Sequence, residues 1–328
     1  MINKLSYSYE VYGLHICTNL ELPGLQENTT SQKIPDIKVT LGSLPEDILD
    51  KNRASVQNYY TDKNSDSSTD QPHLVVNLIS DGNYFHFKYD DGIQFVLDKQ
   101  ASKVWGTWEA PYDMDYCALY LLGPILGFML RLRDITCLHA SGIVIDDQVL
   151  AFCGFSGSGK STLAAKFATR GYPVITDDVM PITRHDNQFF VNSGYPRLRL
   201  YPGSFKEQDE LPRLSRHVDK CYLDLTAGKY LFHRGSLRLH SIYIFDWGKR
   251  NSHIQPKIRP ISSGGALSLL AANTYRNELL DFSMKGNEFE ILGNLVSKVP
   301  VKQLQPVNNI LTLDCLVDYI LDYHAGIQ

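Results

Sequence analysis

Cysteine is sparse in this sequence of 328 residues, with six cysteines and no Cys-x-x-Cys pair. No cluster of His and Cys residues has the spacing of a zinc site. The sequence therefore predicts neither a disulfide framework nor a zinc centre, and we expect reduced thiols in a cytoplasmic protein. The six are Cys17, Cys117, Cys137, Cys153, Cys221 and Cys315.

A strong charge of either sign and a long apolar run are also missing. The formal net charge of −4 provides no general attraction to nucleic acid or to an anionic membrane. The first residues, MINKLSYSYEVYGL, lack the apolar core of a signal peptide. The most apolar stretch, 116–130, contains Gly-Pro and is shorter than the roughly 20 residues of a membrane span. We expect a buried helix there, and no nucleic-acid or membrane partner.

Two styles of sequence follow one another along the chain. Residues 1–112 contain short β-rich runs, among them a hairpin in which Asp-Asp-Gly joins NYFHFKY to IQFVLD. The polar segment 61–72 is predicted as a mobile loop. The apolar helix, within 113–134, would connect this β-rich domain to an α/β domain over 135–328. There the order is strand, Asp-Asp turn, strand, glycine loop, helix, strand, with later helices over 264–281 and 311–324.

The glycine loop matches Gly-x-x-x-x-Gly-Lys-Ser/Thr at every required position. It lies between an apolar strand and an amphipathic helix, the context that a phosphate-binding loop needs. Glycines let the backbone turn with its N–H groups inward, the helix start favours anions, the lysine bridges phosphates, and Ser161 suits Mg²⁺. The predicted nucleotide-binding residues are Gly154, Phe155, Ser156, Gly157, Ser158, Gly159, Lys160, Ser161 and Thr162.

Two aspartates, Asp177 and Asp178, end the strand PVIT that follows the loop helix. If that strand lies beside the strand before the loop, both carboxylates reach the bound phosphates, since α/β sheets bind ligands at the carboxyl ends of their strands. One would hold Mg²⁺ and the other would accept the proton of an attacking hydroxyl. Asp246, at the end of SIYIFD, is the second candidate for Mg²⁺.

Other residues are candidates for the same site. His139 lies in the strand that precedes the loop and would orient an aspartate or contact phosphate. Arg197 and Arg199 alternate on one strand and would serve anions, either the transferring phosphate or a peptide carboxylate. Tyr275 and Arg276 are a further pair in the late helix.

Together these residues resemble the C-terminal catalytic domain of HPr kinase/phosphorylase, a P-loop kinase fold of the HPr kinase/PEP carboxykinase type. That family has a histidine, the phosphate loop, a helix ending in Arg-Gly and an Asp-Asp pair, and here they are His139, 154–161, 170–171 and 177–178. The resemblance implies ATP and Mg²⁺ as cofactors. It puts His139 and Lys160 in the active site and implies that Ser161 binds Mg²⁺ and that Asp178 accepts the serine proton, with Asp177 beside it. A homo-oligomer is a further option by resemblance.

The family's second signature, Glu-Ile-Arg-Gly, is missing, and GYPRLRLYPGS stands in its approximate place. We therefore do not assign the reverse, phosphorylase reaction. A narrower resemblance starts at YEVYGLHICTNLELPGL and continues at DIKVTLGSLPED. These segments are similar to the HPr-kinase-like proteins encoded with lasso peptides, which phosphorylate the C-terminal serine side chain of a precursor peptide.

Three functions remain open from the sequence. The first is an ATP- and Mg²⁺-dependent kinase acting on a peptide serine, with an HPr-type protein kinase as its nearest variant. The second is a nucleotide-dependent regulator with slow hydrolysis, which would use the same loop. The third is a small-molecule kinase, which only its substrate distinguishes.

Overall fold

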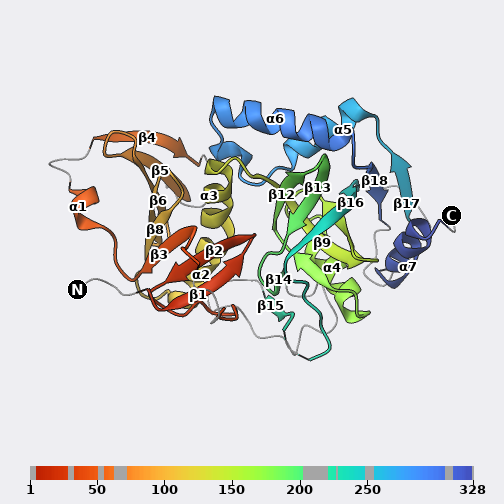
Figure 1. Ribbon diagram of the computed structural model, residues 1–328, viewed down its shortest axis with the longest axis horizontal. Helices are drawn as coiled ribbons and strands as arrows, with labels where there is room; N and C mark the ends of the chain where they lie inside the picture. Colours follow the sequence, from red (N-terminus) through yellow and green to blue (C-terminus); the bar gives the residue numbers. More distant parts are fainter. Residues whose placement is uncertain are drawn as a thin grey trace. The chain divides into compact units, whose positions relative to one another are not determined.

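The computed structural model describes residues 5–28, 33–50, 55–62, 72–201, 221–226, 228–247, 255–306 and 313–326. The predicted mobile loop, 61–72, lies mostly outside these ranges. The chain divides into two compact units, Met1–Arg133 and Asp134–Gln328 (Figure 1). Each unit has its own sheet and is described by itself below.

The first unit contains an eight-stranded sheet within its described residues. All neighbouring strands are antiparallel except β2–β3 and β3–β8. The predicted hairpin is present, with Lys88 paired to Gln94. In sheet order the strands are β1 (Tyr7–Val11), β2 (Leu14–Thr18), β3 (Ile37–Leu41), β8 (Lys103–Thr107), β7 (Gln94–Asp98), β6 (Tyr84–Tyr89), β5 (Leu74–Ile79) and β4 (Val56–Thr61).

The apolar segment forms a helix in three parts that belongs to the first unit. It consists of α2 (Met114–Tyr120), a π-helical turn η1 (Leu121–Ile125) and α3 (Leu126–Leu132). Pro124 lies inside the π turn, where its missing N–H breaks the regular hydrogen-bond ladder. Among the described helices, this one is long and apolar enough to cross a membrane. However, 78% of its most apolar window is buried within the protein.

The packing of this helix explains why it groups with the first sheet. The Phe128 ring makes edge-on contacts with Phe85 and Phe87, at 5.1 and 5.4 Å between ring centroids. The Tyr12 hydroxyl donates to the Leu122 carbonyl over 2.9 Å. A short helix, α1 (Glu46–Leu49), completes the described helices of this unit.

The second unit is mixed α/β. Its larger sheet follows the order β10 (Gln148–Cys153), β9 (Thr136–Ile145), β12 (Val179–His185), β13 (Gln188–Asn192), β16 (Ser236–Phe245), β18 (Val301–Gln305) and β17 (Lys257–Pro260), with β11 (Val174–Thr176) also paired to β9. β10 pairs with β16 as well, so the path from β10 through β13 to β16 closes on itself. A two-stranded sheet contains β14 (Arg197–Leu200) and β15 (Cys221–Asp224).

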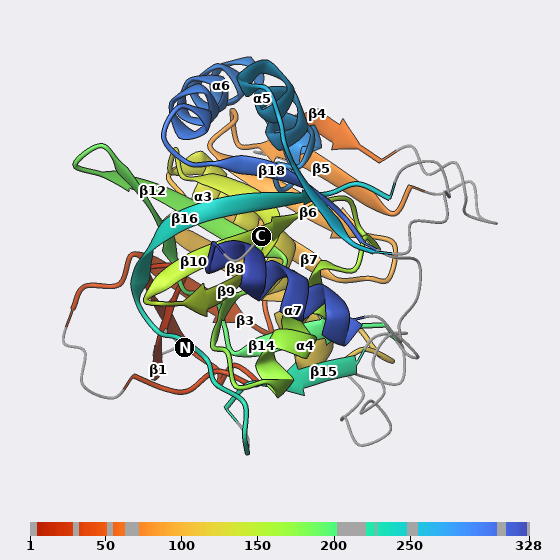
Figure 2. The same cartoon turned by 90° about the vertical axis from the view of Figure 1, so that its right-hand side faces the viewer.

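Helices cover both faces of the larger sheet (Figure 2). α4 (Lys160–Thr169) and α7 (Leu313–His324) share one apolar core with the sheet, which includes Phe152, Phe167 and Val317. α5 (Ser263–Ala272) and α6 (Phe282–Val296) share the other, which includes Ile175, Leu270 and Leu292. Both cores contain side chains of β10, the strand that leads into the phosphate loop.

Two sequence expectations need correction. The predicted helix over 264–281 ends at Ala272, because the chain then runs beside β9 and Arg276 adopts a left-handed φ of 53°. A short 3₁₀ turn, η3 (Asn277–Leu279), follows, and then the unpredicted α6. The strand PVIT was expected beside the strand that precedes the loop, but β9 lies between them and pairs with both.

Candidate active site

The phosphate loop connects the buried end of β10 to the start of α4. Gly157 and Gly159 have φ values of 79° and 94°, the left-handed region that favours glycine. A side chain at Gly154 would meet the Ser158 Oγ, since a Cβ there would lie 2.8 Å from that atom. The first turn of α4 leaves amide N–H groups without partners inside the helix, and these suit an anion.

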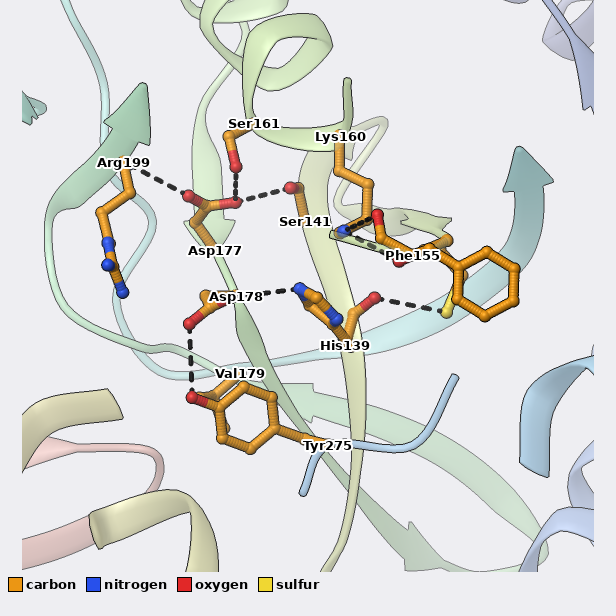
Figure 3. Close-up of polar contacts among 12 residues, drawn as sticks. His139, Ser141, Phe155, Lys160, Ser161, Asp177, Asp178, Val179, Arg199 and Tyr275 are labelled. Atoms are coloured by element: carbon orange, nitrogen blue, oxygen red, sulfur yellow. Dashed lines mark hydrogen bonds and ion pairs between the residues drawn. The ribbon is translucent and has the colours of Figure 1, made fainter. Parts of the chain in front are cut away.

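Lys160 is buried at the base of this loop. Its Nζ donates to the carbonyl oxygens of Gly154 and Phe155, over 2.8 and 3.0 Å (Figure 3). These bonds hold the ammonium group inside the turn, where phosphate oxygens would bring a second set of acceptors. Cys153, just before the loop, is no nucleophile, because burial raises the pKa of its thiol to about 12.

Asp177 lies below the loop, buried at the end of β11. Its Oδ1 accepts hydrogen bonds from the hydroxyls of Ser141 and Ser161, over 2.6 and 2.9 Å, and its Oδ2 accepts from the Arg199 amide over 3.2 Å. Burial raises the pKa of Asp177, with the neighbouring Asp178 acting in the same direction, against the hydrogen bonds that lower it.

The paired oxygens of Ser161 and Asp177 fit a magnesium ion. Mg²⁺ prefers oxygen ligands and keeps several waters, so one or two protein ligands with substrate phosphates suffice. The described residues contain no group of three or more His, Cys, Asp or Glu side chains that could hold a metal by themselves. With two protein oxygens, a divalent ion at this place would take its remaining ligands from substrate phosphates and water.

Asp178 turns away from its neighbour and lies beside His139. Its φ of 68° is left-handed and interrupts the strand between β11 and β12, which run in the same direction along β9, so the two carboxylates are directed differently. The His139 Nε2 is 3.1 Å from one carboxylate oxygen, and the Tyr275 hydroxyl donates to the other over 3.3 Å. Figure 3 shows Asp177 directed towards Ser161 and Asp178 towards His139 and Tyr275.

The backbone explains how these residues come together. His139 on β9 is paired with Val179 on β12, directly after Asp178. The segment after α5 runs along β9, where the His139 amide donates to the Asn273 carbonyl and the Tyr275 amide to the Cys137 carbonyl, both over 2.8 Å. Tyr275 therefore reaches Asp178 from a distant part of the sequence, and its ring contacts His139 edge-on.

One pocket collects most of the predicted site residues. Asp177 lies beneath this pocket and Tyr201 was not predicted from the sequence. No sequence motif identified Tyr201. The only signal was its spacing of two residues from Arg199, which puts both side chains on the same side of an extended chain. The lining residues are His139, Ser156, Gly157, Gly159, Lys160, Ser161, Thr162, Asp178, Arg199 and Tyr201.

The two arginines of β14 have different surroundings. Arg199 lines the pocket, and its Nε is buried without a hydrogen-bond partner among the described residues. Burial opposes its charge, yet the Asp178 carboxylate and nearby tyrosines raise the pKa of Arg199 above its ordinary value. The Arg197 guanidinium lies instead over the Tyr222 ring, 5.0 Å from its centroid, and does not line this pocket.

The remaining candidates lie outside the pocket lining. The Asp246 carboxylate accepts a hydrogen bond from Gln305 over 2.7 Å. Arg276 pairs with Glu278 over 3.0 Å. The basic residues Lys206, Arg213, Arg216 and Lys220, which follow the arginine pair in the sequence, lie outside the described residues.

Comparisons with known proteins do not assign this chain to a family. No family model matches the sequence, and no curated protein matches it. Among solved structures, the HPr(Ser) kinase/phosphatase from Coxiella burnetii is similar, with 16% sequence identity and a TM-score of 0.32. That alignment covers 57% of this chain and 98% of the other. The function proposed below rests on the residues of the site.

Proposed function

We propose that this protein is an ATP- and Mg²⁺-dependent kinase that phosphorylates a serine hydroxyl of a peptide. The observation that carries the proposal is the shared pocket of Lys160, Ser161 and Asp178. It combines a loop for phosphates, an oxygen pair for a divalent ion and a carboxylate held by a histidine. These are the parts that phosphoryl transfer requires, because the reaction depends on positioning and charge stabilisation.

In the proposed reaction the serine oxygen attacks the γ-phosphorus of ATP. The bond from that phosphorus to the β–γ bridging oxygen breaks, ADP leaves and the serine proton passes to Asp178. His139 holds the carboxylate in place, while Lys160 leaves its carbonyl partners for the phosphate oxygens. Bound Mg²⁺ would supply positive charge to the phosphates from the side of Ser161 and Asp177.

Arg199 is the second cation of the pocket and faces the growing charge on the transferred group. Its buried Nε needs an acceptor, and a phosphoryl oxygen would supply one. We assign Arg197, whose guanidinium lies over the Tyr222 ring, to binding the carboxylate at the end of a peptide. This division of roles agrees with the sequence resemblance to kinases of lasso precursor peptides, and we propose the C-terminal serine of such a peptide as the acceptor in the cytoplasm.

The experiment is mass spectrometry of precursor peptides encoded near this gene, after incubation with the protein and Mg-ATP. We expect a gain of one HPO₃ group on the C-terminal serine, and none on a peptide ending in alanine. Free phosphate without a modified peptide would instead favour the nucleotide-dependent regulator. Modification of an HPr-type protein, with untouched peptides, would favour the protein-kinase variant.

A further inference from the structure

We infer that Trp247 is the docking surface for the base of the bound nucleotide. The inference rests on the proposed function and adds a contact that the phosphate loop itself cannot supply. Trp247 directly follows Asp246 at the end of β16, and it is 43% exposed. An indole ring left this exposed beside a nucleotide loop has a large apolar face available for stacking.

The indole is fixed against the phosphate loop. Its Nε1–H donates to the Ser158 carbonyl over 3.1 Å. Its Cζ2 atom would lie 3.8 Å from a Cβ built on Gly159, a residue that lines the pocket. The position of the ring is therefore set by the same turn that would hold the phosphates.

One side of the ring already has a partner. Phe245 is stacked on Trp247, with 6.2 Å between centroids and 22° between the ring planes. Since Phe245 and the loop take part of the indole surface, the exposed part is available to a second planar group. A purine base is such a group, and stacking on aromatic side chains is how proteins bind bases without sequence-dependent hydrogen bonds.

The sheet order puts Trp247 on the correct flank of the loop. Next to the end of β10, β9 and then β12 lie on one side, and β16 lies on the other. Asp178 precedes β12, so the acceptor carboxylate and Trp247 flank the phosphate loop on opposite sides. β12, β9, β10 and β16 are therefore successive hydrogen-bonded strands around the loop. A nucleotide with its γ-phosphate at Asp178 would extend its base towards Trp247.

Phe155 is the competing aromatic side chain, with 67% of its surface exposed. It belongs to the loop, and Figure 3 shows it directed away from Asp178, His139 and Arg199. Among the described residues no hydrogen bond or aromatic contact holds the Phe155 ring, whereas Trp247 is held by a hydrogen bond and a stacked neighbour. We therefore assign the base to Trp247 and use Phe155 as the comparison.

The test measures binding by the full-length protein, without any peptide, so it does not depend on kinase activity. The ligands are Mg-ATP and Mg-tripolyphosphate, which carries the phosphates without a base. Trp247→Ala should weaken Mg-ATP binding by roughly 5- to 150-fold, the range of base–aromatic stacking, and leave tripolyphosphate binding unchanged. Trp247→Phe should retain most of the ATP affinity. Phe155→Ala, within the loop, should not distinguish the two ligands, and Phe289→Ala, at an exposed aromatic residue of α6, should change neither affinity.

A spectroscopic readout follows from the position of the tryptophans. Trp105 and Trp108 lie in the first unit, so Trp247 is the single tryptophan of the second. In a Trp105→Phe/Trp108→Phe variant, Mg-ATP should change the indole emission and tripolyphosphate should not.

Three results would overturn the inference. An equal loss of affinity for both ligands in Trp247→Ala would make the indole a support for the loop only. A loss confined to Phe155→Ala would move the base to that ring, and unchanged binding in every variant would leave Trp247 no role. If the wild-type protein bound neither ligand, the proposed kinase function itself would be wrong.

Discussion

Two adjacent carboxylates of this protein have different environments. Asp177 is buried beneath the loop and accepts hydrogen bonds from Ser141 and Ser161, while Asp178 faces the pocket beside His139. The sequence predicted that the pair would lie near the phosphate loop. It could not separate their directions, because the left-handed φ of Asp178 is set by the path of the chain from β11 into β12.

This difference predicts distinct effects for substitutions at the two ends of the pocket. Lys160→Ala should abolish both Mg-ATP binding and phosphoryl transfer, because the loop loses its buried cation. Asp178→Asn should abolish transfer and keep nucleotide binding, since the amide retains the shape but cannot take the serine proton. Calorimetry with Mg-ATP and the peptide assay measure the two properties. Loss of nucleotide binding in a folded Asp178→Asn protein would contradict the role as base.

The two arginines provide a matched comparison. Arg199→Ala should lower the transfer rate about 10²- to 10³-fold, because its side chain lines the pocket. This is the effect of removing one hydrogen-bond donor from the charge that develops in the transition state. Arg197→Ala should leave the chemical step largely intact and raise the peptide KM. Steady-state kinetics with a C-terminal serine peptide measure both. Equal losses of kcat in the two variants would show that this division of roles is wrong.

The buried carboxyl of Asp177 predicts a dependence of stability on pH. Its pKa is raised, so between the ordinary value of 3.8 and the raised value the folded protein binds more protons than the unfolded chain. The free energy of unfolding should therefore fall as pH rises through that window, in the absence of Mg²⁺. Urea denaturation at a series of pH values gives the free energy of unfolding as a function of pH. We expect this free energy to depend less on pH in Asp177→Asn than in the wild-type protein.

Asp146→Asn is the control for that experiment, because Asp146 lies in the exposed turn between β9 and β10, with 87% of its side chain exposed. It should keep the wild-type slope. A slope unchanged by Asp177→Asn would mean that Asp177 is ionised in both states over this range.

At the scale of elements, the helix after the phosphate loop is tied to the last described helix. Arg170, at the end of α4, forms ion pairs with Asp314 and Asp318, and Lys166 pairs with Asp314 over 2.9 Å. The sequence resemblance treats Arg170 as part of a family motif. In the structure the Arg170 side chain contacts α7 and does not line the pocket.

Arg170→Met should therefore be a modest stability variant with normal chemistry. The acidic partners are more than half exposed, so we expect a loss of about 0.2–1 kcal/mol in unfolding free energy and a transfer rate close to wild type. Ile320→Ala, in the buried face of α7, should cost about 2–5 kcal/mol. Urea denaturation and the peptide assay separate the two effects, and a large loss of kcat in Arg170→Met would contradict this interpretation.

Local signals succeeded for some elements and failed for others. The hairpin turn at Asp146 and Asp147 and the start of α4 were predictable, because short-range turn chemistry and glycine fix them. The region 264–281 reads as one helix by its apolar spacing. Pairing of Thr274 with Leu138 overrides that pattern, and this long-range contact also delivers Tyr275 to the site. A single sequence contains no signal for such a contact.

On the scale of the whole molecule, all residues that line the pocket belong to the second unit. The fragment 134–328 has two apolar cores of its own and should fold alone. We expect it to bind Mg-ATP with nearly the affinity of the full chain, as measured by calorimetry. A folded fragment without affinity would show that the first unit contributes to nucleotide binding.

The strand that supports the phosphate loop has hydrogen-bonded neighbours on both sides, β9 and β16. No edge of β10 is open to water, so its amide hydrogens can exchange with solvent only when the surrounding strands separate. In deuterium-labelling experiments they should therefore be among the slowest of the chain and report the global opening of the second unit. The glycine turn that follows could then change its conformation while β10 stays in place. A ligand could enter and leave without any rearrangement of the two apolar cores.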